Sequence, residues 1–259
     1  LLPRDTTEDR DAIIEIRAGT GGDEASLFAG DLLRMYQRFA EERGWRFEHM
    51  ESSPSDVGGF KEVVCRIAGD EVFRYLKYEG GVHRVQRVPS TETQGRVHTS
   101  TATVAVMPEA EEVDIEIRPE DLRIEVCRSG GAGGQHVNKT ESAVQIWHIP
   151  TGVYVRCEEE RSQMKNREKG MKILRAKLFE AKKREEAEKY SAARRSLIGS
   201  GGREEKIRTY NFPQNRLTEH RIGYTSNNLD GVLLGKMEEL IMALLHEEMQ
   251  ERLAEAGMS

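Results

Sequence analysis

The segment at residues 161–195 constrains the fold more than any other stretch of this chain, because it predicts one long helix. Its apolar side chains form a single narrow stripe at helical spacing. The residues of this stripe are Met164, Met171, Leu174, Leu178 and Ala181. A stripe this narrow can cover one face of a small sheet while the opposite helix face stays in solvent. The following residues 197–202 contain three glycines and predict a flexible hinge.

Charge distinguishes this segment from the rest of the chain. It holds 13 basic and five acidic residues, a net charge of +8, whereas the whole chain of 259 residues carries −6. The remainder therefore carries −14, which excludes a uniformly basic nucleic-acid binder. We infer one module built to approach a polyanion, although on charge alone a plain solvated helix face is the commoner explanation.

Several classes of protein are disfavoured by what the sequence lacks. No apolar run approaches the roughly 18 residues of a membrane span. The three cysteines (Cys65, Cys127 and Cys157) form no C-x-x-C pair, which rules out a disulfide framework and argues against a zinc site. We therefore expect a cytoplasmic protein with no membrane partner and no bound metal. Because the chain starts at Leu1 without a signal-like segment, we expect its natural N-terminus to lie upstream.

Apolar periodicity predicts an α+β organisation in two units. The first opens with a strand at 11–17, a glycine-rich turn, and an amphipathic helix that has Asp23 as its N-cap and ends near Gly44. Further strands are expected at 45–51, 60–67, 82–88 and 97–106, and a short helix at 72–78.

The second unit begins near Glu111 with a predicted strand over residues 113–117. The long helix is preceded by three further expected strands, around 122–126, 144–146 and 153–157. After the hinge, residues 206–224 return as extended chain, and an acidic helix ends the sequence. The apolar face of that last helix includes Met237, Ile241 and Leu244.

The glycine-rich loop at 130–140 is the most informative stretch for chemistry. The run from Gly133 to Thr140 nearly matches a phosphate-binding G-x-x-x-x-G-K-T loop, but Asn138 occupies the second required glycine. A β pattern also follows where the helix N-terminus of such a loop must lie. No G-x-G-x-x-G is present, so neither nucleotide nor dinucleotide binding is favoured.

Paired glycines ahead of a glutamine indicate another use for this loop. Gly133 and Gly134 let the backbone adopt positive φ and expose the N–H of Gln135, which can stabilise charge on an oxygen as oxyanion-hole donors do. A flexible hairpin connection is the simplest alternative, yet so long a loop on a small sheet is uncommon unless it is functional. For His136, a neutral structural role is commoner than that of a general base.

Four stretches of the chain resemble the class I peptide chain release factors. The context RSGGAGGQHVNKTESAV is similar to their GGQ loop, and RSQMKNREKG and RTYNFPQNRLTEHR match downstream. GGQ alone is a weak signal, because ribosome-rescue hydrolases share it. The upstream stretch GGVHRVQRVPSTETQGRVHTSTATVAVMPE resembles the codon-reading domain, which rescue hydrolases lack. Pro89-Ser90-Thr91 fits the Pro-x-Thr tripeptide of bacterial members that read UAA and UAG, rather than the Ser-Pro-Phe of those that read UAA and UGA.

The resemblance spans essentially the whole chain and implies both a fold and a division into domains. The implied fold is α+β, a codon-reading α/β sandwich superdomain plus a small mixed β-sheet domain with one long basic helix carrying the GGQ loop. A codon-recognition domain would occupy residues 1–108 and a GGQ peptidyl-hydrolysis domain residues 109–207, with the family's hinge matching 197–207. A C-terminal segment at 208–259 would pack back on the first domain. We expect the family's additional N-terminal helical domain to be missing here.

The same resemblance implies a set of codon-binding residues. They are Gly21, Glu24, Gln86, Pro89, Ser90, Thr91, His98 and Thr99. The Thr91 hydroxyl both donates and accepts, which suits the first two bases, and His98 can stack between the second and third. A glutamine amide at 86 can present its oxygen to adenine or its NH₂ to guanine at the third base, beside Thr99. Without the resemblance, polar residues such as these on a strand ordinarily just face solvent.

For catalysis the resemblance implies Gly133, Gly134 and Gln135, with the Gln135 N–H stabilising the leaving 3′ oxygen as water attacks the peptidyl-tRNA ester. Gln135 would also be methylated, by a glutamine methyltransferase, to N5-methylglutamine. No cofactor is implied, and the protein would not be a stand-alone enzyme, because the reaction takes place in the ribosomal peptidyl transferase centre. Its partners would be rRNA of that centre and of the decoding centre, the mRNA stop codon, peptidyl-tRNA and a class II release factor GTPase.

Two other functions are weighed against a stop-codon-reading factor. A codon-independent ribosome-rescue hydrolase would carry a basic tail for the empty mRNA channel, whereas the tail at 238–255 is acidic. A plain RNA-binding adaptor would release no peptide on any codon.

Overall fold

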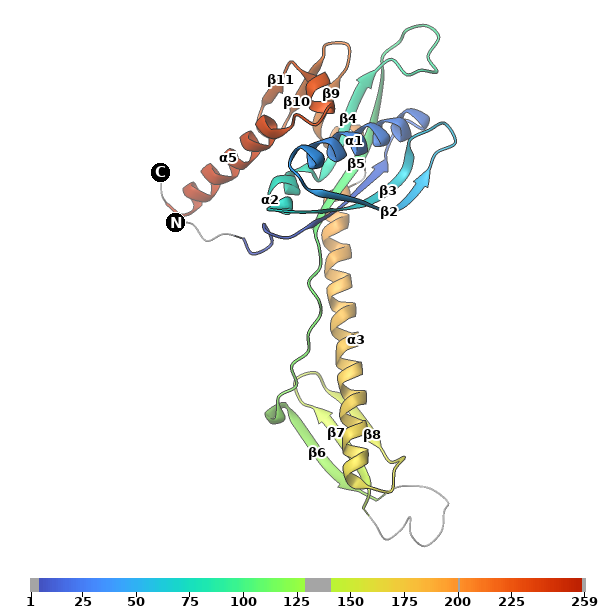
Figure 1. Ribbon diagram of the computed structural model, residues 1–259, viewed down its shortest axis with the longest axis vertical. Helices are drawn as coiled ribbons and strands as arrows, with labels where there is room; N and C mark the ends of the chain where they lie inside the picture. Colours follow the sequence, from blue (N-terminus) through green and yellow to red (C-terminus); the bar gives the residue numbers. More distant parts are fainter. Residues whose placement is uncertain (1–4, 129–140, 200, 258–259) are drawn as a thin grey trace. The chain divides into compact units, whose positions relative to one another are not determined.

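The computed structural model describes residues 5–128, 141–199 and 201–257. The predicted catalytic residues Gly133, Gly134 and Gln135, together with His136, lie outside the described residues. The chain divides into two compact units, one formed by Leu1–Ala110 with Ser191–Ser259 and the other by Glu111–Tyr190. The α+β fold class is thereby confirmed, with a large sheet, a small sheet and one long helix (Figure 1). In this division into compact units, residues 191–207 fall in the larger unit.

The larger unit is organised by an eight-stranded sheet with the order β11-β10-β9-β4-β5-β1-β3-β2. Its strands are β1 (Ala12–Ala18), β2 (Arg46–Pro54), β3 (Phe60–Ala68), β4 (Gly81–Arg87), β5 (His98–Pro108), β9 (Lys206–Asn211), β10 (Arg216–Glu219) and β11 (Tyr224–Ser226). Neighbouring strands are antiparallel except β4 and β9, which run parallel. A parallel pair needs a crossover connection, and here the crossover contains the whole smaller unit.

The helices of the larger unit cover its sheet and complete its core. They are α1 (Asp23–Glu42), α2 (Val72–Leu76), the 3₁₀ turns η1 (Lys77–Glu79) and η3 (Arg203–Glu205), α4 (Leu229–Leu233) and α5 (Glu238–Glu255). Figure 1 shows α1 lying across the sheet, and its helical-period residues Phe28, Leu32 and Met35 are fully buried. The terminal helix α5 buries Leu240 and Ile241 in the same core.

The predicted N-cap of α1 is wrong. The capping position is Gly22, at φ 59°, and it makes no side-chain capping bond, so Asp23 lies inside the first turn. Positive φ is accessible to glycine at little cost, which is why the chain can enter the helix in this conformation. Asp23 and Glu24 still favour the helix start by their charge against the helix dipole. The short helix α4 was not predicted from the sequence.

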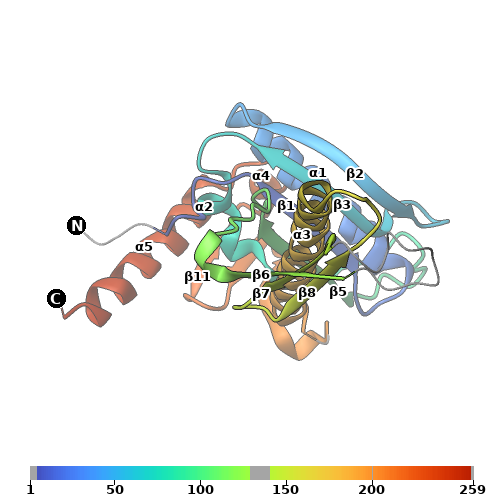
Figure 2. The ribbon, with the colours of Figure 1, turned by 90° about the horizontal axis from the view of Figure 1, so that it is seen from below.

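The smaller unit is a three-stranded antiparallel sheet packed on part of the long helix. Its strands β6 (Leu122–Cys127), β7 (Ala143–His148) and β8 (Val153–Cys157) have the order β6-β7-β8, after the 3₁₀ turn η2 (Pro119–Asp121). Figure 2 shows the strands lying beside α3 (Gln163–Ile198). The fully buried core is small: Val144, Ile146, Val155, Leu174 and Leu178.

Two predictions about this unit need correction. Met164 is 72% exposed and Ala181 is exposed, so the buried stripe of α3 is Asn166, Gly170, Leu174 and Leu178, with Met171 partly buried. Gly170 allows close packing, since a Cβ there would lie 2.9 Å from Ile146 Cδ1. The predicted strand over 113–117 is wrong: those residues pair with no strand in the structure as described, although the side chains of Ile115 and Ile117 pack on the core as extended chain.

Candidate functional site

The loop between β4 and β5 (Figure 1) carries the predicted residues Pro89, Ser90 and Thr91, and the strand ends on either side of it carry Gln86, His98 and Thr99. A turn closed by the Glu92 N–H donating to the Pro89 carbonyl at 3.0 Å begins this loop. Pro89 is buried, whereas Ser90 and Thr91 are exposed. The turn therefore anchors the tripeptide by its proline and presents the Thr91 hydroxyl to solvent, where a ligand can meet it.

Glu92 organises the rest of the loop, and sequence reasoning missed it. Its side chain is only 2% exposed, and its Oε1 accepts the Gln94 N–H at 2.8 Å. Its Oε2 lies 2.6 Å from His98 Nε2, so one carboxylate holds both the loop backbone and the predicted stacking residue. The Gln94 N–H and then the His98 contact lower the pKa of Glu92, which keeps it ionised. Half of the His98 side chain stays exposed, at 49%.

Gly21 at the start of α1 packs against the same strand that carries Thr99. Its φ is 124°, and a Cβ there would lie 2.4 Å from Ser100 Cβ. Backbone bonds clamp the approach, because the Gly19 N–H donates to the Thr101 carbonyl and the Thr101 N–H to the Thr20 carbonyl, both at 2.8 Å. Packing alone thus requires glycine at 21, whatever the residue contacts in a complex.

Glu24 lies inside an ion-pair cluster. Its carboxylate accepts from Arg87 Nε, and Arg87 Nη1 donates to Asp31 Oδ2 at 2.6 Å. Burial alone would lower the pKa of Arg87, but the Glu24 and Asp31 carboxylates raise it overall. A hollow of about 410 Å³ beside the cluster is lined in part by Glu24, Arg87, Pro89 and Ser90, which brings the helix tip and the tripeptide together around one space.

Gln86 and Thr99 are direct neighbours in the sheet. The β4–β5 register pairs them, and the β4–β9 register places Asn211 on the other side of Gln86. The Asn211 amide donates to Gln86 Oε1 at 3.3 Å. The structure therefore groups Gln86 and Thr99 as the sequence suggested, and adds Asn211, which no local pattern indicated.

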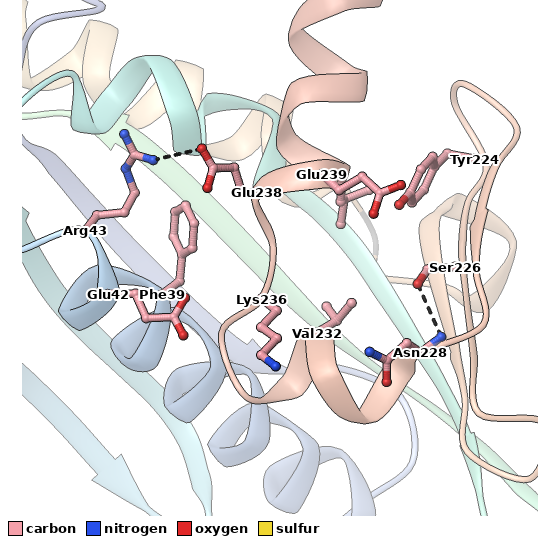
Figure 3. Close-up of a pocket in the computed structure, with 11 residues that line it drawn as sticks. Phe39, Glu42, Arg43, Tyr224, Ser226, Asn228, Val232, Lys236, Glu238 and Glu239 are labelled. Atoms are coloured by element: carbon pink, nitrogen blue, oxygen red, sulfur yellow. Dashed lines mark hydrogen bonds and ion pairs between the residues drawn. The ribbon is translucent and has the colours of Figure 1, made fainter.

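A second and larger hollow, of about 570 Å³, lies elsewhere on this unit (Figure 3). Residues from α1, β11, α4 and α5 line it, and none of the predicted codon-binding residues is among them. Its charges are mixed and partly paired, with Arg43 Nη1 3.7 Å from Glu238 Oε1. It offers no single-sign surface for an anion or a cation.

Within residues 5–128, 141–199 and 201–257, no group of three or more His, Cys, Asp or Glu side chains could hold a metal ion. Over the same residues, no helix has the length and apolarity that crossing a membrane requires.

Both parts of the chain, residues 1–104 and 111–221, match models of known protein families. A PCRF domain model matches residues 1–104, and an RF-1 domain model matches residues 111–221. Peptide chain release factor 1 of Akkermansia muciniphila is 94% identical over 259 residues, which cover all of this chain and 72% of that relative. The chain belongs to the peptide chain release factor 1 family. Peptide chain release factor 1 of Carboxydothermus hydrogenoformans is 59% identical over 253 residues, which cover 98% of this chain and 71% of the relative.

A solved structure supports the same family at the level of the fold. RF2 of Thermus thermophilus matches with a TM-score of 0.60 and 38% identity, over 95% of this chain and 70% of that one. As a member of the family, the protein is a translation-termination factor that acts on the ribosome. In this release factor the β4–β5 loop and the helix tip belong to the part that the PCRF model covers, whereas α3 and the three-stranded sheet belong to the RF-1 domain.

Proposed function

We propose that this release factor recognises UAA and UAG in the ribosomal A site and triggers hydrolysis of the peptidyl-tRNA ester. The observation that carries the proposal is the β4–β5 loop, which exposes Thr91 on a turn anchored by buried Pro89 and holds His98 against Glu92. Gln86 and Thr99 lie in register at the base of the same loop. Hydroxyl, amide and imidazole groups grouped in this way suit unstacked RNA bases, which are read by hydrogen bonds and stacking.

The other codon-binding assignments are part of this proposal. Gly21 and Glu24 lie at the helix tip, and Ser90 shares the 410 Å³ hollow with Glu24. In the free protein Glu24 is 7% exposed and its carboxylate is bonded to Arg87, so contact with a base requires Glu24 to exchange that partner or to act through its backbone.

The proposed reaction belongs to the residues Gly133, Gly134 and Gln135, with the Gln135 N–H as donor to the leaving oxygen. We assign no stand-alone enzymatic activity, because the ester and the remaining groups of the site are supplied by the ribosome. The basic residues exposed along α3, among them Lys172, Lys182 and Lys183, suit contact with rRNA. In functional terms we propose a codon-recognition domain at 1–108, a hydrolysis domain at 109–207 and a C-terminal segment at 208–259.

The proposed partners are the rRNA of the decoding and peptidyl transferase centres, the mRNA stop codon and peptidyl-tRNA. A glutamine methyltransferase acting on Gln135 and a class II release factor GTPase complete the set, in the cytoplasm and without a cofactor.

Release of a labelled peptide from ribosomes programmed with UAA, UAG, UGA or no A-site codon tests the function. We expect release on UAA and UAG only. Release on all four would indicate a codon-independent rescue hydrolase, and release on none would indicate an RNA-binding adaptor. Thr91→Val removes the hydroxyl while keeping the branched shape, and we expect it to lower kcat/KM on both codons by about tenfold, from one lost base contact. A wild-type kcat/KM on both UAA and UAG in that variant would contradict the assignment of the tripeptide.

A further inference from the structure

Asn211 lies beside the proposed third-base residue although the chain separates them by 125 positions. It occupies the last position of β9, which pairs in parallel with β4 and puts Asn211 in register with Gln86. On the other side of Gln86, the antiparallel β5 contributes Thr99 at the same level. The Phe212 N–H donates to the Gln86 carbonyl at 3.0 Å, which fixes the two backbones next to each other.

Chemistry determines which way the Asn211 amide points. Its Oδ1 accepts the backbone N–H of Gln214 at 3.1 Å, and a backbone N–H can only donate. The atom facing Gln214 must therefore be the oxygen, and the nitrogen Nδ2 faces the other way. Nδ2 lies 3.3 Å from Gln86 Oε1 and 3.5 Å from Gln214 Oε1, so both of its contacts are acceptors.

The orientation of the Asn211 amide also determines that of the Gln86 amide. Because Nδ2 can only donate, the Gln86 atom that meets it must be the oxygen Oε1. The other end of the Gln86 amide, the NH₂ group, is then the end left for a ligand. Gln86 as a whole is partly exposed.

We propose that Asn211 is a positioning residue that holds the Gln86 amide with its NH₂ group toward the third base of the codon. This inference rests on the proposed function, in which Gln86 meets that base. Adenine and guanine both carry an N7 acceptor, and guanine adds O6. A fixed donor therefore accepts both purines through an atom that they share. Rotation of the glutamine amide between two orientations is then not needed for reading both purines.

Asn211→Asp tests this orientation with almost no change of shape. The aspartate still accepts the Gln214 N–H, but its second oxygen attracts the Gln86 NH₂ group and turns the amide over. The Gln86 oxygen then faces the base, where it can accept from the adenine N6 amine but meets only acceptors on guanine N7 and O6. We expect kcat/KM for release on UAG to fall about tenfold relative to UAA, with UAA itself changing less than about threefold.

Three further variants make the outcome decisive. Gln86→Ala asks whether Gln86 reads the third base, and in that background Asn211→Asp should leave the UAA to UAG ratio unchanged. Asn211→Ala removes the donor without adding a carboxylate, and should shift the ratio in the same direction by about threefold. Asn227→Asp is the matched control, since it adds the same charge at an exposed asparagine of the same unit.

Each result has one meaning. If Gln86→Ala leaves release on all codons unaltered, the proposed third-base role of Gln86 fails. If Gln86→Ala changes codon use but both Asn211 variants leave the UAA to UAG ratio at the wild-type value, the positioning role is overturned. The same holds if the Asn211 variants slow release equally on UAA and UAG, because a merely structural role lowers both codons together. Ribosome-binding affinity and thermal midpoints of each variant separate loss of folding from loss of discrimination.

Discussion

The two compact units of this release factor are stabilised by different means. The larger unit buries charges: Glu79, Arg208 and Glu219 have no exposed surface. Arg208 binds Glu79 with two hydrogen bonds, of 2.6 and 2.7 Å, across 129 positions of the chain. The smaller unit instead buries a neutral amide, Asn166, which donates to the Ser142 and Glu160 carbonyls at 2.7 and 2.8 Å and accepts the Glu160 N–H at 2.9 Å.

This difference shows how each unit depends on distant parts of the chain. In the larger unit, the Arg208–Glu79 pair ties β9 to the segment that precedes β4, and His83 joins them by a 2.8 Å bond to the Tyr210 hydroxyl and a 2.7 Å bond to the Glu79 carbonyl. β9 also carries Asn211, so the buried charges hold a strand that serves the proposed codon site. In the smaller unit the Asn166 bonds reach at most 24 positions.

The largest expected effect comes from breaking the buried pair of the larger unit. Arg208→Met leaves Glu79 buried without its partner, and removing one partner of a buried ion pair costs about 3–5 kcal/mol of the free energy of unfolding. Each unit contains one of the two tryptophans, Trp45 in the larger and Trp147 in the smaller, so single-tryptophan variants report the two unfolding transitions separately. Only the unfolding transition reported by Trp45 should shift to a lower midpoint.

Arg216→Met is the matched control for that experiment, because Arg216 is an exposed arginine on the neighbouring strand β10. It should change the free energy of unfolding by no more than about 0.5 kcal/mol. Equal shifts of the Trp45 and Trp147 transitions in Arg208→Met would contradict the separation of the two units.

The second prediction separates chemistry from codon binding. Gly134→Val removes the access to positive φ that the sequence indicates for the catalytic loop, and we expect peptide release to fall by about 10²–10³, as for loss of a preorganised donor. Ribosome binding on a stop codon should stay near normal, because the codon site lies in the other unit. Gly152→Val changes a glycine that has a positive φ, of 73°, in the same unit, and it should retain release. Parallel loss of binding and release in Gly134→Val would argue against the division of labour.

The third prediction tests the neutral amide of the smaller unit. Asn166→Leu leaves the Ser142 and Glu160 carbonyls and the Glu160 N–H without their partner, and we expect a loss of about 2 kcal/mol in the free energy of unfolding. The Trp147 transition should shift and the Trp45 transition should not. Met164→Leu, two residues earlier at an exposed position, is the control. A stability equal to wild type in Asn166→Leu would show that local backbone contacts alone hold this unit together.

The smallest effect is a pH dependence confined to the larger unit. Burial, and then the Arg208 charge, lower the pKa of His83 to about 3, so the folded state keeps it neutral while the unfolded chain titrates near its usual 6.5. The contribution of neutral His83 to the free energy of unfolding is therefore fully present above pH 6.5 and is lost as the pH falls toward 3. Between pH 6.5 and 5.5 we expect the Trp45 transition to lose about 1 kcal/mol from this group. The loss should disappear in His83→Gln; if it persists there, another group is responsible.

Much of the secondary structure could be predicted because it depends on neighbours in sequence. The strands at β1, β3, β7 and β8 and the helices α1 and α3 follow from apolar residues at periods of two or about 3.6. The failures have the same origin. Apolar and polar residues alternate over 113–117 as they do in a strand. A strand also needs a neighbouring strand to pair with, and the local pattern does not indicate whether one is present. Likewise, Met164 was predicted to be buried because it is apolar. The side of α3 that packs on the sheet instead contains the polar Asn166 and the small Gly170.

The candidate site shows the same division. The tripeptide at 89–91 and the residues Gln86, His98 and Thr99 were found from one continuous stretch that resembles known release factors. Glu92 lies in that stretch and was missed, since a carboxylate six residues before a histidine has no distinctive spacing; only its burial and its 2.6 Å contact mark it. Asn211 lies in RTYNFPQNRLTEHR, which also resembles the family, but nothing in its local sequence marked it as a site residue.

The amino-acid sequence by itself determined the family, the α+β class and the long basic helix, because each of these depends on residues that are close together along the chain. Tertiary structure decided which polar groups meet: Arg87 with Glu24, Arg208 with Glu79, and Asn211 with Gln86. Those pairs join positions 63 to 129 residues apart. The last two pairs meet because β4 and β9 are parallel neighbours in the sheet, and the first because α1 packs beside β4, and no local pattern in the sequence reports which elements become neighbours.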